Sequence, residues 1–243
     1  MDKLVVKGGG KLRGEVSISG SKNAALPILA ATLLTDEKCV IKNVPQLRDV
    51  LTMIKILRAL GVKAQMSDNV AEIEPEGYKE YTAPYKLVST MRASICVLGP
   101  LVAKKRRAHV SIPGGCVIGP RPIDLHLKGI KALGADVKIE HGYVIAHAEH
   151  LRGNSIYLGG AFGSSVLATA NVMMAAVLAR GKTIIENAAC EPEIGDLSEF
   201  LKKMGARIDG AGTPLVEIEG VKKLGGAVHT VIPDRIEAGT YMV

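Results

Sequence analysis

The sequence predicts an α/β fold built from three copies of one βαβαββ unit, because two markers recur along the chain. The first marker is a Leu-x-Gly motif, which stands at Leu12-Arg13-Gly14, Leu151-Arg152-Gly153 and, more loosely, Leu224-Gly225-Gly226. The second marker is a glycine that follows a helical apolar pattern, found at Gly61, Gly134 and Gly205. Such a glycine is typical of the residue just after a helix, where the backbone turns left-handed. Three such units would pack about a pseudo-threefold axis into one lobe.

The first unit is expected to alternate strands with helices and to close on a pair of strands. A strand at Val16–Ser19 leads through a Gly/Ser turn into a buried helix at Lys22–Leu34, whose Pro27 lies within its first turns. The remaining elements are predicted at Cys39–Lys42, Leu47–Leu60, Val62–Gln65 and Val70–Ile73. The second of these is assigned as an amphipathic helix because Val50, Leu57 and Leu60 form an apolar stripe at helical spacing.

The other two units repeat this plan. The middle unit has predicted elements at Lys86–Val102 (helix), Ala108–Ile112 (strand), Ile123–Leu133 (helix), Val137–Glu140 and Tyr143–Ala146 (closing strands). The third unit begins with a strand at Ile156–Leu158 and a helix that starts at Ser165. The alternative is an open doubly wound sheet. Strands and helices alternate strictly in that fold, and the repeated double-strand ending disfavours it.

The composition is that of an ordered globular protein, since 47% of the 243 residues are hydrophobic and 23% are charged. Aromatic residues make up only 3%, which leaves no platform for stacking nucleic-acid bases. The net charge of +7 is compatible with nucleic acid or with a small phosphorylated substrate, and composition does not choose between them.

The four cysteines are dispersed, with no C-x-x-C pair and no histidine at metal-ligand spacing. No apolar core of a signal peptide follows Met1, and the apolar stretches are too short to span a membrane. The sequence therefore predicts a soluble protein of a reducing compartment.

Cys116 is the first candidate for chemistry. It lies in a Gly- and Pro-rich loop between a predicted strand and helix, where nearby Arg121 would favour its thiolate form. This setting suits a nucleophile or a proton donor, and the alternative is an ordinary solvent-facing thiol. The other cysteines, Cys39, Cys96 and Cys190, are expected to pack in the core.

Three cationic positions are the other candidates. Lys22 opens the first buried helix together with Asn23, and a helix N-terminus with a lysine attracts anions. The alternative is a capped helix whose lysine points into solvent. Arg92 stands in an apolar segment, where it could pair with an acid or hold a phosphate. Pro122 and Asp124 suit the start of a helix, but Arg121 carries the wrong charge for that position.

Several of these segments, in fixed order, resemble the UDP-N-acetylglucosamine 1-carboxyvinyltransferases, a family of enolpyruvyl transferases. The matching segments are Ser19–Pro27, Thr90–Ser94, Pro113–Cys116, Gly119–His126, Glu186–Ala189 and Glu191–Glu193. The 5-enolpyruvylshikimate-3-phosphate synthases share the fold but lack this cysteine loop, so they are a weaker fit. The resemblance implies an inside-out α/β barrel with three βαβαββ units per lobe.

The resemblance also implies a reaction, which transfers the enolpyruvyl group of phosphoenolpyruvate to the 3′-hydroxyl of UDP-N-acetylglucosamine and releases phosphate. This is the first committed step of peptidoglycan synthesis, it takes place in the cytoplasm, and it requires no metal or organic cofactor. Nucleic acid and membrane insertion are not expected. The rival interpretation is a non-catalytic module that binds anions or nucleic acid.

Residue roles follow from the same resemblance. Cys116 would protonate the methylene carbon, form a covalent adduct with phosphoenolpyruvate, and be the target of fosfomycin. Lys22 and Arg121 would neutralise phosphate and carboxylate, and Asn23 would hydrogen-bond the substrates near the reacting carbon. The UDP-sugar site would be lined by Arg92, Arg121, Pro122, Ile123, Asp124, Leu125, Ser165 and Val166.

The sequence departs from the family at three points. Leu167 stands where a glycine often follows Ser165-Val166, and a lysine often found slightly earlier is replaced near Gly163. The family's chain also continues beyond Val243. We therefore expect residues 22–229 to form a complete lobe, and residues 1–21 and 230–243 to form the edges of a second lobe of the same polypeptide. That second lobe would carry the general base, so the 243 residues are expected to be inactive alone.

Overall fold

The chain forms three four-stranded sheets of identical design. The structure, a computed structural model, describes residues 3–11, 13–114, 122–161 and 163–243. The first sheet has the order β12-β1-β3-β2, with bounds Val228–Thr230, Cys39–Lys42, Val70–Glu74 and Lys63–Ser67. The second has the order β4-β5-β7-β6, with bounds Thr82–Ala83, Arg107–Ser111, Tyr143–His147 and Asp136–Glu140. The third has the order β8-β9-β11-β10, with bounds Ser155–Tyr157, Lys182–Glu186, Leu215–Glu219 and Arg207–Asp209.

The pairing pattern is the same in every sheet. The first two strands run parallel, and each of the next two pairs antiparallel with its neighbour. Parallel strands cannot be joined by a hairpin: helical segments connect β4 to β5 and β8 to β9, and β12 and β1 come from distant parts of the sequence, whereas each closing pair is a simple hairpin. The predicted three-unit α/β fold is confirmed.

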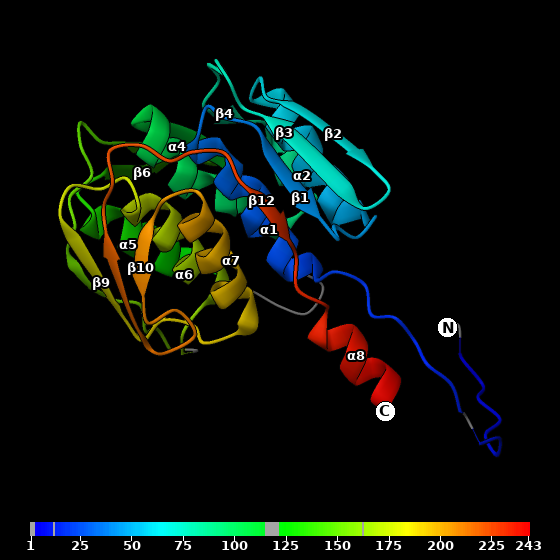
Figure 1. Ribbon diagram of the computed structural model, residues 1–243. Coiled ribbons are helices and arrows are strands. Elements are labelled where there is room, and N and C mark those ends of the chain that lie inside the picture. Colours follow the sequence, from blue (N-terminus) through cyan, green and yellow to red (C-terminus); the bar gives the residue numbers. More distant parts are fainter. Residues whose placement is uncertain (1–2, 12, 115–121, 162) are drawn as a thin grey trace.

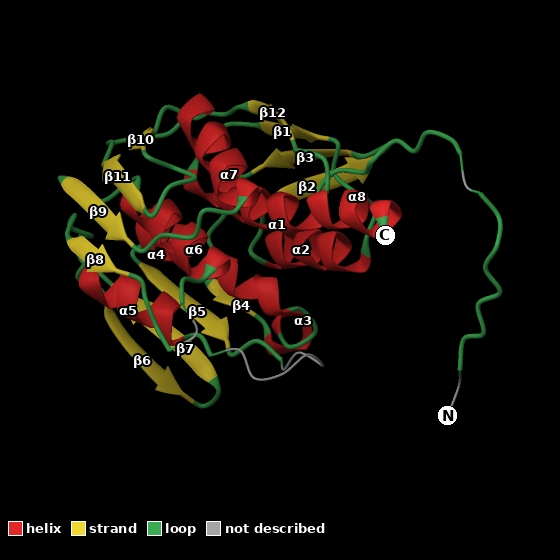
Figure 2. Ribbon diagram, turned by 90° about the horizontal axis from the view of Figure 1, so that it is seen from below, coloured by secondary structure: helices red, strands yellow, loops and turns green. Residues whose placement is uncertain are grey.

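The interior helices lie between the sheets, and the sheets lie on the outside (Figure 2). Each unit contributes one interior helix: α1 (Lys22–Ala31) with its 3₁₀ extension η1 (Thr32–Leu34), α4 (Leu98–Lys105) preceded by the 3₁₀-helix η2 (Arg92–Val97), and α6 (Val166–Ala176). The interior helices are apolar on almost every side; in α6, every residue from Ala168 to Ala176 is buried. This arrangement confirms the expected inside-out α/β architecture.

The remaining helices are α2 (Arg48–Ala59), α5 (Asp124–Ala132), α7 (Pro192–Lys203), α3 (Tyr85–Val88) and α8 (Arg235–Met242). The first three are amphipathic and take the same place in each unit. Each is followed by the predicted glycine, and Gly61, Gly134 and Gly205 have positive φ angles of 92°, 94° and 104°. These glycines provide the left-handed residue that ends each helix. None of the helices in the described part of the chain is long and apolar enough to cross a membrane.

The predicted strand at Val16–Ser19 is wrong. Its place beside β1 is taken by β12 from the far end of the sequence, where Val40 pairs with Val228 in parallel (Figure 1). Val16 is instead 55% exposed. The Leu-x-Gly marker still locates the strand correctly, since β12 begins as far beyond Leu224 as β8 begins beyond Leu151. The first unit is therefore completed by β12, and the three units form a closed ring.

The predicted single helix at Lys86–Val102 is also wrong, because it is broken into α3, η2 and α4. Met91 is extended, with φ −146° and ψ 122°, so the helix cannot run through it. The Ser94 hydroxyl donates to the carbonyl of Val88 at 3.0 Å and also to that of Met91. A serine hydroxyl that binds nearby carbonyls offers the backbone an alternative to the helical ladder. The other predicted helices and closing strands match the observed elements to within a few residues.

Two helical glycines provide a matched test of interior packing. A Cβ at Gly129 of α5 would overlap Cγ2 of Val172 in α6, whereas a Cβ at Gly195 of α7 would have nothing within 4 Å. We expect Gly129→Ala to lower the free energy of unfolding by about 1–3 kcal/mol through overpacking. Gly195→Ala should raise it by up to about 1 kcal/mol through helix propensity. Urea denaturation of both variants measures the difference, and equal effects would contradict the close packing of α5 on α6.

Candidate active site

The start of α1 is held in place by its flanking residues. The Ser21 side chain accepts a hydrogen bond from the amide of Ala24 at 3.3 Å, and the Ser21 amide donates to the Ile232 carbonyl at 2.8 Å. A Cβ at Gly20 would overlap the carbonyl of Asn43, so the close approach of these two backbone segments requires glycine. These contacts fix where Lys22 and Asn23 emerge from the lobe.

Lys22 is paired with Asp49, which lies in the first turn of α2. The Lys22 Nζ and Asp49 Oδ2 atoms are 2.9 Å apart, and each side chain is 35% exposed. The lysine is therefore a partly buried, positioned cation rather than a solvated one. Sequence reasoning missed Asp49, because the pairing depends on how α1 packs against α2. The acidic residue in the first turn of the predicted helix was the available signal.

A hollow of about 480 Å³ adjoins this cation. Its walls are Lys22 and Asn23 on one side and, on the other, Asp234, Ile236, Glu237, Thr240 and Tyr241 from the start and body of α8. The two sides are joined because the Ser19 amide donates to Glu237 Oε2 at 3.0 Å and the Asp234 amide donates to the Ser19 carbonyl at 2.8 Å. A lysine at a helix N-terminus facing a hollow of this size is suited to a small anion.

A second group of predicted residues meets at the start of α5. Arg92 Nη2 donates to the Pro122 carbonyl at 3.1 Å. The Leu125 side chain packs against Gly160: a Cβ placed on that glycine would lie 3.5 Å from Cδ2 of Leu125, which is ordinary van der Waals contact. Arg92, the segment Pro122–Leu125 and the turn before α6 are therefore neighbours.

The start of α6 is built like the start of α1. The Ser165 side chain accepts from the amide of Ala168 at 3.3 Å, just as Ser21 accepts from Ala24. Gly163 has a positive φ of 84°, and Leu167 packs partly buried against the hydrophobic core. The Leu167 side chain is thus accommodated by the core.

The repeat relates the residues at the start of α1 to those around Arg92 and the start of α5. Lys22, Arg92 and Val166 are the first residues of α1, η2 and α6, the interior segments of the three units. Since the units share one topology, these positions lie at the same end of the lobe. The structure thus places Lys22 and Arg92 at equivalent sites of two repeats. Cys116 and Arg121 lie outside the described residues.

A buried polar network supports Arg92 and α5 from beneath. The Asn171 side-chain amide donates to the Ile95 carbonyl at 2.9 Å and faces His126 Nδ1 at 3.0 Å, while its oxygen accepts from the Gly99 amide at 2.6 Å. One asparagine of α6 therefore links η2, α4 and α5. With Nδ1 as the acceptor, the His126 proton is on Nε2, which is buried and has no partner among the described residues.

Burial lowers the pKa of His126 to about 3, and the nearby charge of Arg92 adds to this effect. The folded protein therefore holds a neutral imidazole against the arginine at ordinary pH. Sequence reasoning included His126 in a motif but assigned it no role, and it missed Asn171 altogether. Neither the neutral state nor the hydrogen bond has a signature in the sequence.

The cysteines separate into two classes. Cys39 and Cys96 are buried as predicted, and burial raises the pKa of Cys39 to about 11 and that of Cys96 to about 12. The prediction that Cys190 packs in the core is wrong, because its residue is exposed beyond the end of β9. Its apolar neighbours Ala188 and Ala189 are the buried residues of that turn. No group of histidine, cysteine or acidic side chains able to hold a metal ion is found within the described ranges.

The pKa of His126 predicts a pH-dependent stability. The unfolded chain takes up a proton on this histidine near pH 6.5, whereas the folded chain resists protonation down to about pH 3. Stability should therefore fall as the pH drops below 6.5, by about 2 kcal/mol at pH 5 on the scale of 1.36 kcal/mol per pH unit.

This is checked by urea denaturation at pH 7 and pH 5. The loss of stability between the two pH values should shrink in His126→Gln, and it should be unchanged in His147→Gln, a control at an exposed position. A loss of the same size in the parent chain and in His126→Gln would show that His126 does not cause it.

The three-unit fold defines a class, that of proteins with the enolpyruvyl transferase fold. The crystal structure of the enolpyruvyl transferase NikO from Streptomyces tendae superposes with a TM-score of 0.83 at 24% identity, covering 97% of this chain and 55% of that one. The EPSP synthase of Acinetobacter baumannii superposes with a TM-score of 0.74 at 16% identity, covering 94% of this chain and 52% of that one. At these identities the likeness shows the fold alone.

The chain belongs to the EPSP synthase (3-phosphoshikimate 1-carboxyvinyltransferase) family, whose model matches residues 6–243. Curated relatives called UDP-N-acetylglucosamine 1-carboxyvinyltransferase are 57% identical in Methylacidiphilum infernorum and 56% identical in Geotalea uraniireducens. Both alignments cover all 243 residues of this chain and 58% of the relative. The resemblance inferred from the sequence motifs is confirmed, and the chain spans about 58% of the length of these relatives.

Proposed function

We propose that this chain forms the part of a UDP-N-acetylglucosamine 1-carboxyvinyltransferase that binds the UDP-sugar and supplies the acid Cys116. The identity of 57% over the whole chain to a relative of that name carries the proposal. The geometry agrees with it, because Lys22 and Arg92 are cations at equivalent ends of two units. Two anionic substrates would need such positive charge at one end of the lobe.

In the proposed reaction, the 3′-hydroxyl of UDP-N-acetylglucosamine gives its proton to a general base, which the second lobe would supply, and its oxygen adds to C2 of phosphoenolpyruvate while a proton is delivered to C3. The tetrahedral intermediate then loses phosphate from C2 and a proton from C3, which restores the carbon–carbon double bond. Cys116 is the proposed donor of the first proton. Atoms and charge balance without a redox partner, so the proposed reaction calls for no cofactor.

The cations have separate tasks in this proposal. Lys22 and Arg121 would offset the charge of phosphate and carboxylate, with Asn23 as a hydrogen-bond partner. Asp49 holds the ammonium group of Lys22 at 2.9 Å and would act as its positioning residue. Arg92, Pro122, Ile123, Asp124, Leu125, Ser165 and Val166 would line the UDP-sugar site, and the buried His126–Asn171 pair would then lie beneath it.

The proposal extends to domain organisation and location. We infer that residues 22–229 form one lobe and that residues 1–21 and 230–243 form the edges of a second lobe of the same polypeptide. Two observations support this: residues 13–17 are exposed, and α8 has no buried residue although its Arg235 reaches Glu193 of α7 at 3.0 Å. A cytoplasmic location fits a reaction on a nucleotide sugar.

The test measures phosphate release from phosphoenolpyruvate, using the complete polypeptide of which these 243 residues are a part. Release should depend on UDP-N-acetylglucosamine, and Cys116→Ala should lower kcat by at least about a hundredfold, as expected for loss of a general acid. Cys190→Ser removes an exposed thiol elsewhere and should leave kcat unchanged within about twofold. Release that depends on shikimate 3-phosphate instead would assign the chain to the sister activity.

The rival, a module that binds nucleic acid through its charge of +7, is tested by titrating duplex DNA at two salt concentrations. Such binding would weaken steeply between 50 and 200 mM salt, roughly by a factor of a thousand for many phosphate contacts. We expect no saturable binding at physiological salt. Tight, salt-sensitive binding together with no phosphate release would favour the rival.

Thiol labelling tests the special position of Cys116. Iodoacetamide should modify Cys116 and the exposed Cys190 before Cys39 or Cys96, whose raised pKa values keep them protonated and whose burial excludes the reagent. In a Cys190→Ser background, Cys116 should be the first residue modified by iodoacetamide and by fosfomycin, as mass spectrometry of peptides will show. Equal labelling of Cys116, Cys39 and Cys96 would contradict this prediction.

A further inference from the structure

A second hollow lies at the opposite end of the interior helices from Lys22. It has a volume of about 220 Å³ and is lined where those helices end, by Leu34 at the end of η1, Val102–Lys104 in α4 and Leu178 after α6. The rise per residue along α1 and η1 separates it from Lys22 by about 20 Å. It is therefore on the pseudo-threefold axis but remote from the candidate active site.

The lining of this hollow is strongly basic. The cations come from the last turn of α4, from the turns that follow α4 and α6, and from the segment that leads to β12, and they are Lys104, Arg106, Arg180, Lys222 and Lys223. His150 is also part of the wall. Among the described residues that line the hollow, none is acidic.

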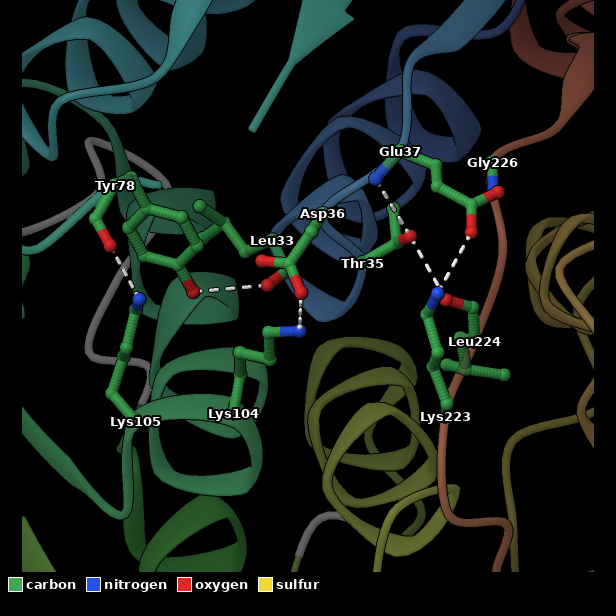
Figure 3. A network of polar contacts seen from close by, with 10 residues as sticks. All are labelled: Leu33, Thr35, Asp36, Glu37, Tyr78, Lys104, Lys105, Lys223, Leu224 and Gly226. Atoms are coloured by element: carbon green, nitrogen blue, oxygen red, sulfur yellow. Dashed lines mark hydrogen bonds and ion pairs between the residues drawn. The ribbon is translucent and has the colours of Figure 1, made fainter. Parts of the chain in front are cut away.

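Two of these cations are already neutralised by the turn after η1. Lys104 Nζ lies 2.5 Å from Asp36 Oδ2, and Lys223 Nζ lies 3.0 Å from Glu37 Oε1. Figure 3 shows the two lysines approaching this turn from α4 and from the segment before β12. Glu37 also accepts from the Gly226 amide at 3.0 Å, and this contact and Lys223 lower its pKa.

The other three cations have no such partner. Within the described ranges, no carboxylate lies within 4.0 Å of Arg106, Arg180 or Lys222. Arg180 Nη2 donates to His150 Nε2 at 2.9 Å, which orients the guanidinium without neutralising it. Arg106 is the left-handed C-cap of α4, and its amide and carbonyl are bonded to Val102 and Ala148. The backbone that carries its side chain is thus fixed.

Cations near helix C-termini also have a purely structural explanation, since each C-terminus carries a partial negative charge of about half a unit. The ends of three helices would account for about one and a half of the unpaired charges. The positive charge that the helix ends do not account for surrounds the hollow. An arginine that is free to present its fork to two oxygens is well suited to phosphate.

We propose that this hollow is a binding site for a small phosphate-type anion, with diphosphate as the chemical class it fits best. Its volume is below the roughly 300–1,000 Å³ of sites for drug-sized ligands, so the anion must have few atoms. Arg106, Arg180 and Lys222 are its binding residues, and Lys104 and Lys223 border it. The proposal does not depend on the enzymatic function proposed above.

The test is calorimetric titration of the polypeptide with inorganic pyrophosphate. The triple variant Arg106→Gln, Arg180→Gln, Lys222→Gln should weaken binding at least about tenfold, because each charge-assisted contact contributes strongly. The matched control Lys55→Gln, Lys63→Gln, Lys131→Gln removes the same net charge from exposed positions elsewhere and should change affinity by less than about twofold. Circular dichroism shows whether both variants remain folded.

Two further measurements complete the test. Arg180→Lys alone keeps the charge but loses the fork, and it should weaken pyrophosphate binding less than the triple variant. Lys22→Gln, at the candidate active site, should leave unchanged the part of the pyrophosphate binding that the triple variant loses. If the triple variant and the control variant weakened binding equally, the effect would be explained by net charge alone. If only Lys22→Gln lost binding, the anion would bind at the other end of the lobe. Either result, or no measurable binding by the parent chain, would overturn the proposal.

Discussion

The need to bury three interior helices is the constraint on which the rest of the structure depends. Each of them is apolar on nearly every side, and the sheet of its own unit can cover only one side. The other sides must be covered by the two neighbouring units. This is why the helices lie inside and the sheets outside, and why the units form a ring instead of an open array. Asn171 links the interior helices through polar contacts as well, because its single side-chain amide bonds to backbone groups of η2 and α4 and to His126 of α5.

The same arrangement explains why the lobe has two chemically different ends. At one end the interior segments begin, and the residues there include the cations Lys22 and Arg92 on caps and 3₁₀ turns. At the other end they terminate, and the following turns differ between units: the first is acidic at Asp36 and Glu37, while the others carry Arg106 and Arg180. The repeat fixes the positions of these residues, whereas their charges are free to vary. Function in such a fold is therefore specified by substitutions at equivalent points of a common frame.

Much of this could be predicted from the sequence. Helical spacing located α2 and α5, and the recurring glycines located their ends, because both signals are local. The strand beside β1 was assigned to Val16–Ser19 although it comes from Val228–Thr230. Both segments follow a Leu-x-Gly marker, and only tertiary pairing decides between them. The break at Met91 depends on Ser94, whose hydroxyl competes with the helical backbone in a way that periodicity does not register.

The candidate site shows the same division. Lys22 and Arg92 were identified from their unusual position in apolar surroundings, which is a local signal. Asp49 was not, because its role exists only once α1 and α2 are packed side by side. The neutral state of His126 likewise arises from burial, and the exposure of Cys190 arises from the direction of one turn. Local patterns thus reveal which residues are available, and three-dimensional packing decides which of them act together.

The closing strand has a consequence for how the chain acquires its structure. Val40 must find Val228, so the first sheet is joined across almost the whole length of the lobe. Pairings between such distant residues are slow to form, because a long loop has to be closed before any contact compensates for the lost entropy. During synthesis the second and third units can assemble their sheets as they leave the ribosome, while the first sheet waits, with the edge of β1 exposed, until Val228–Thr230 of β12 have been made. Closure of the ring is thus the last step in forming this lobe, and the first of its three units to be translated is the last to be completed.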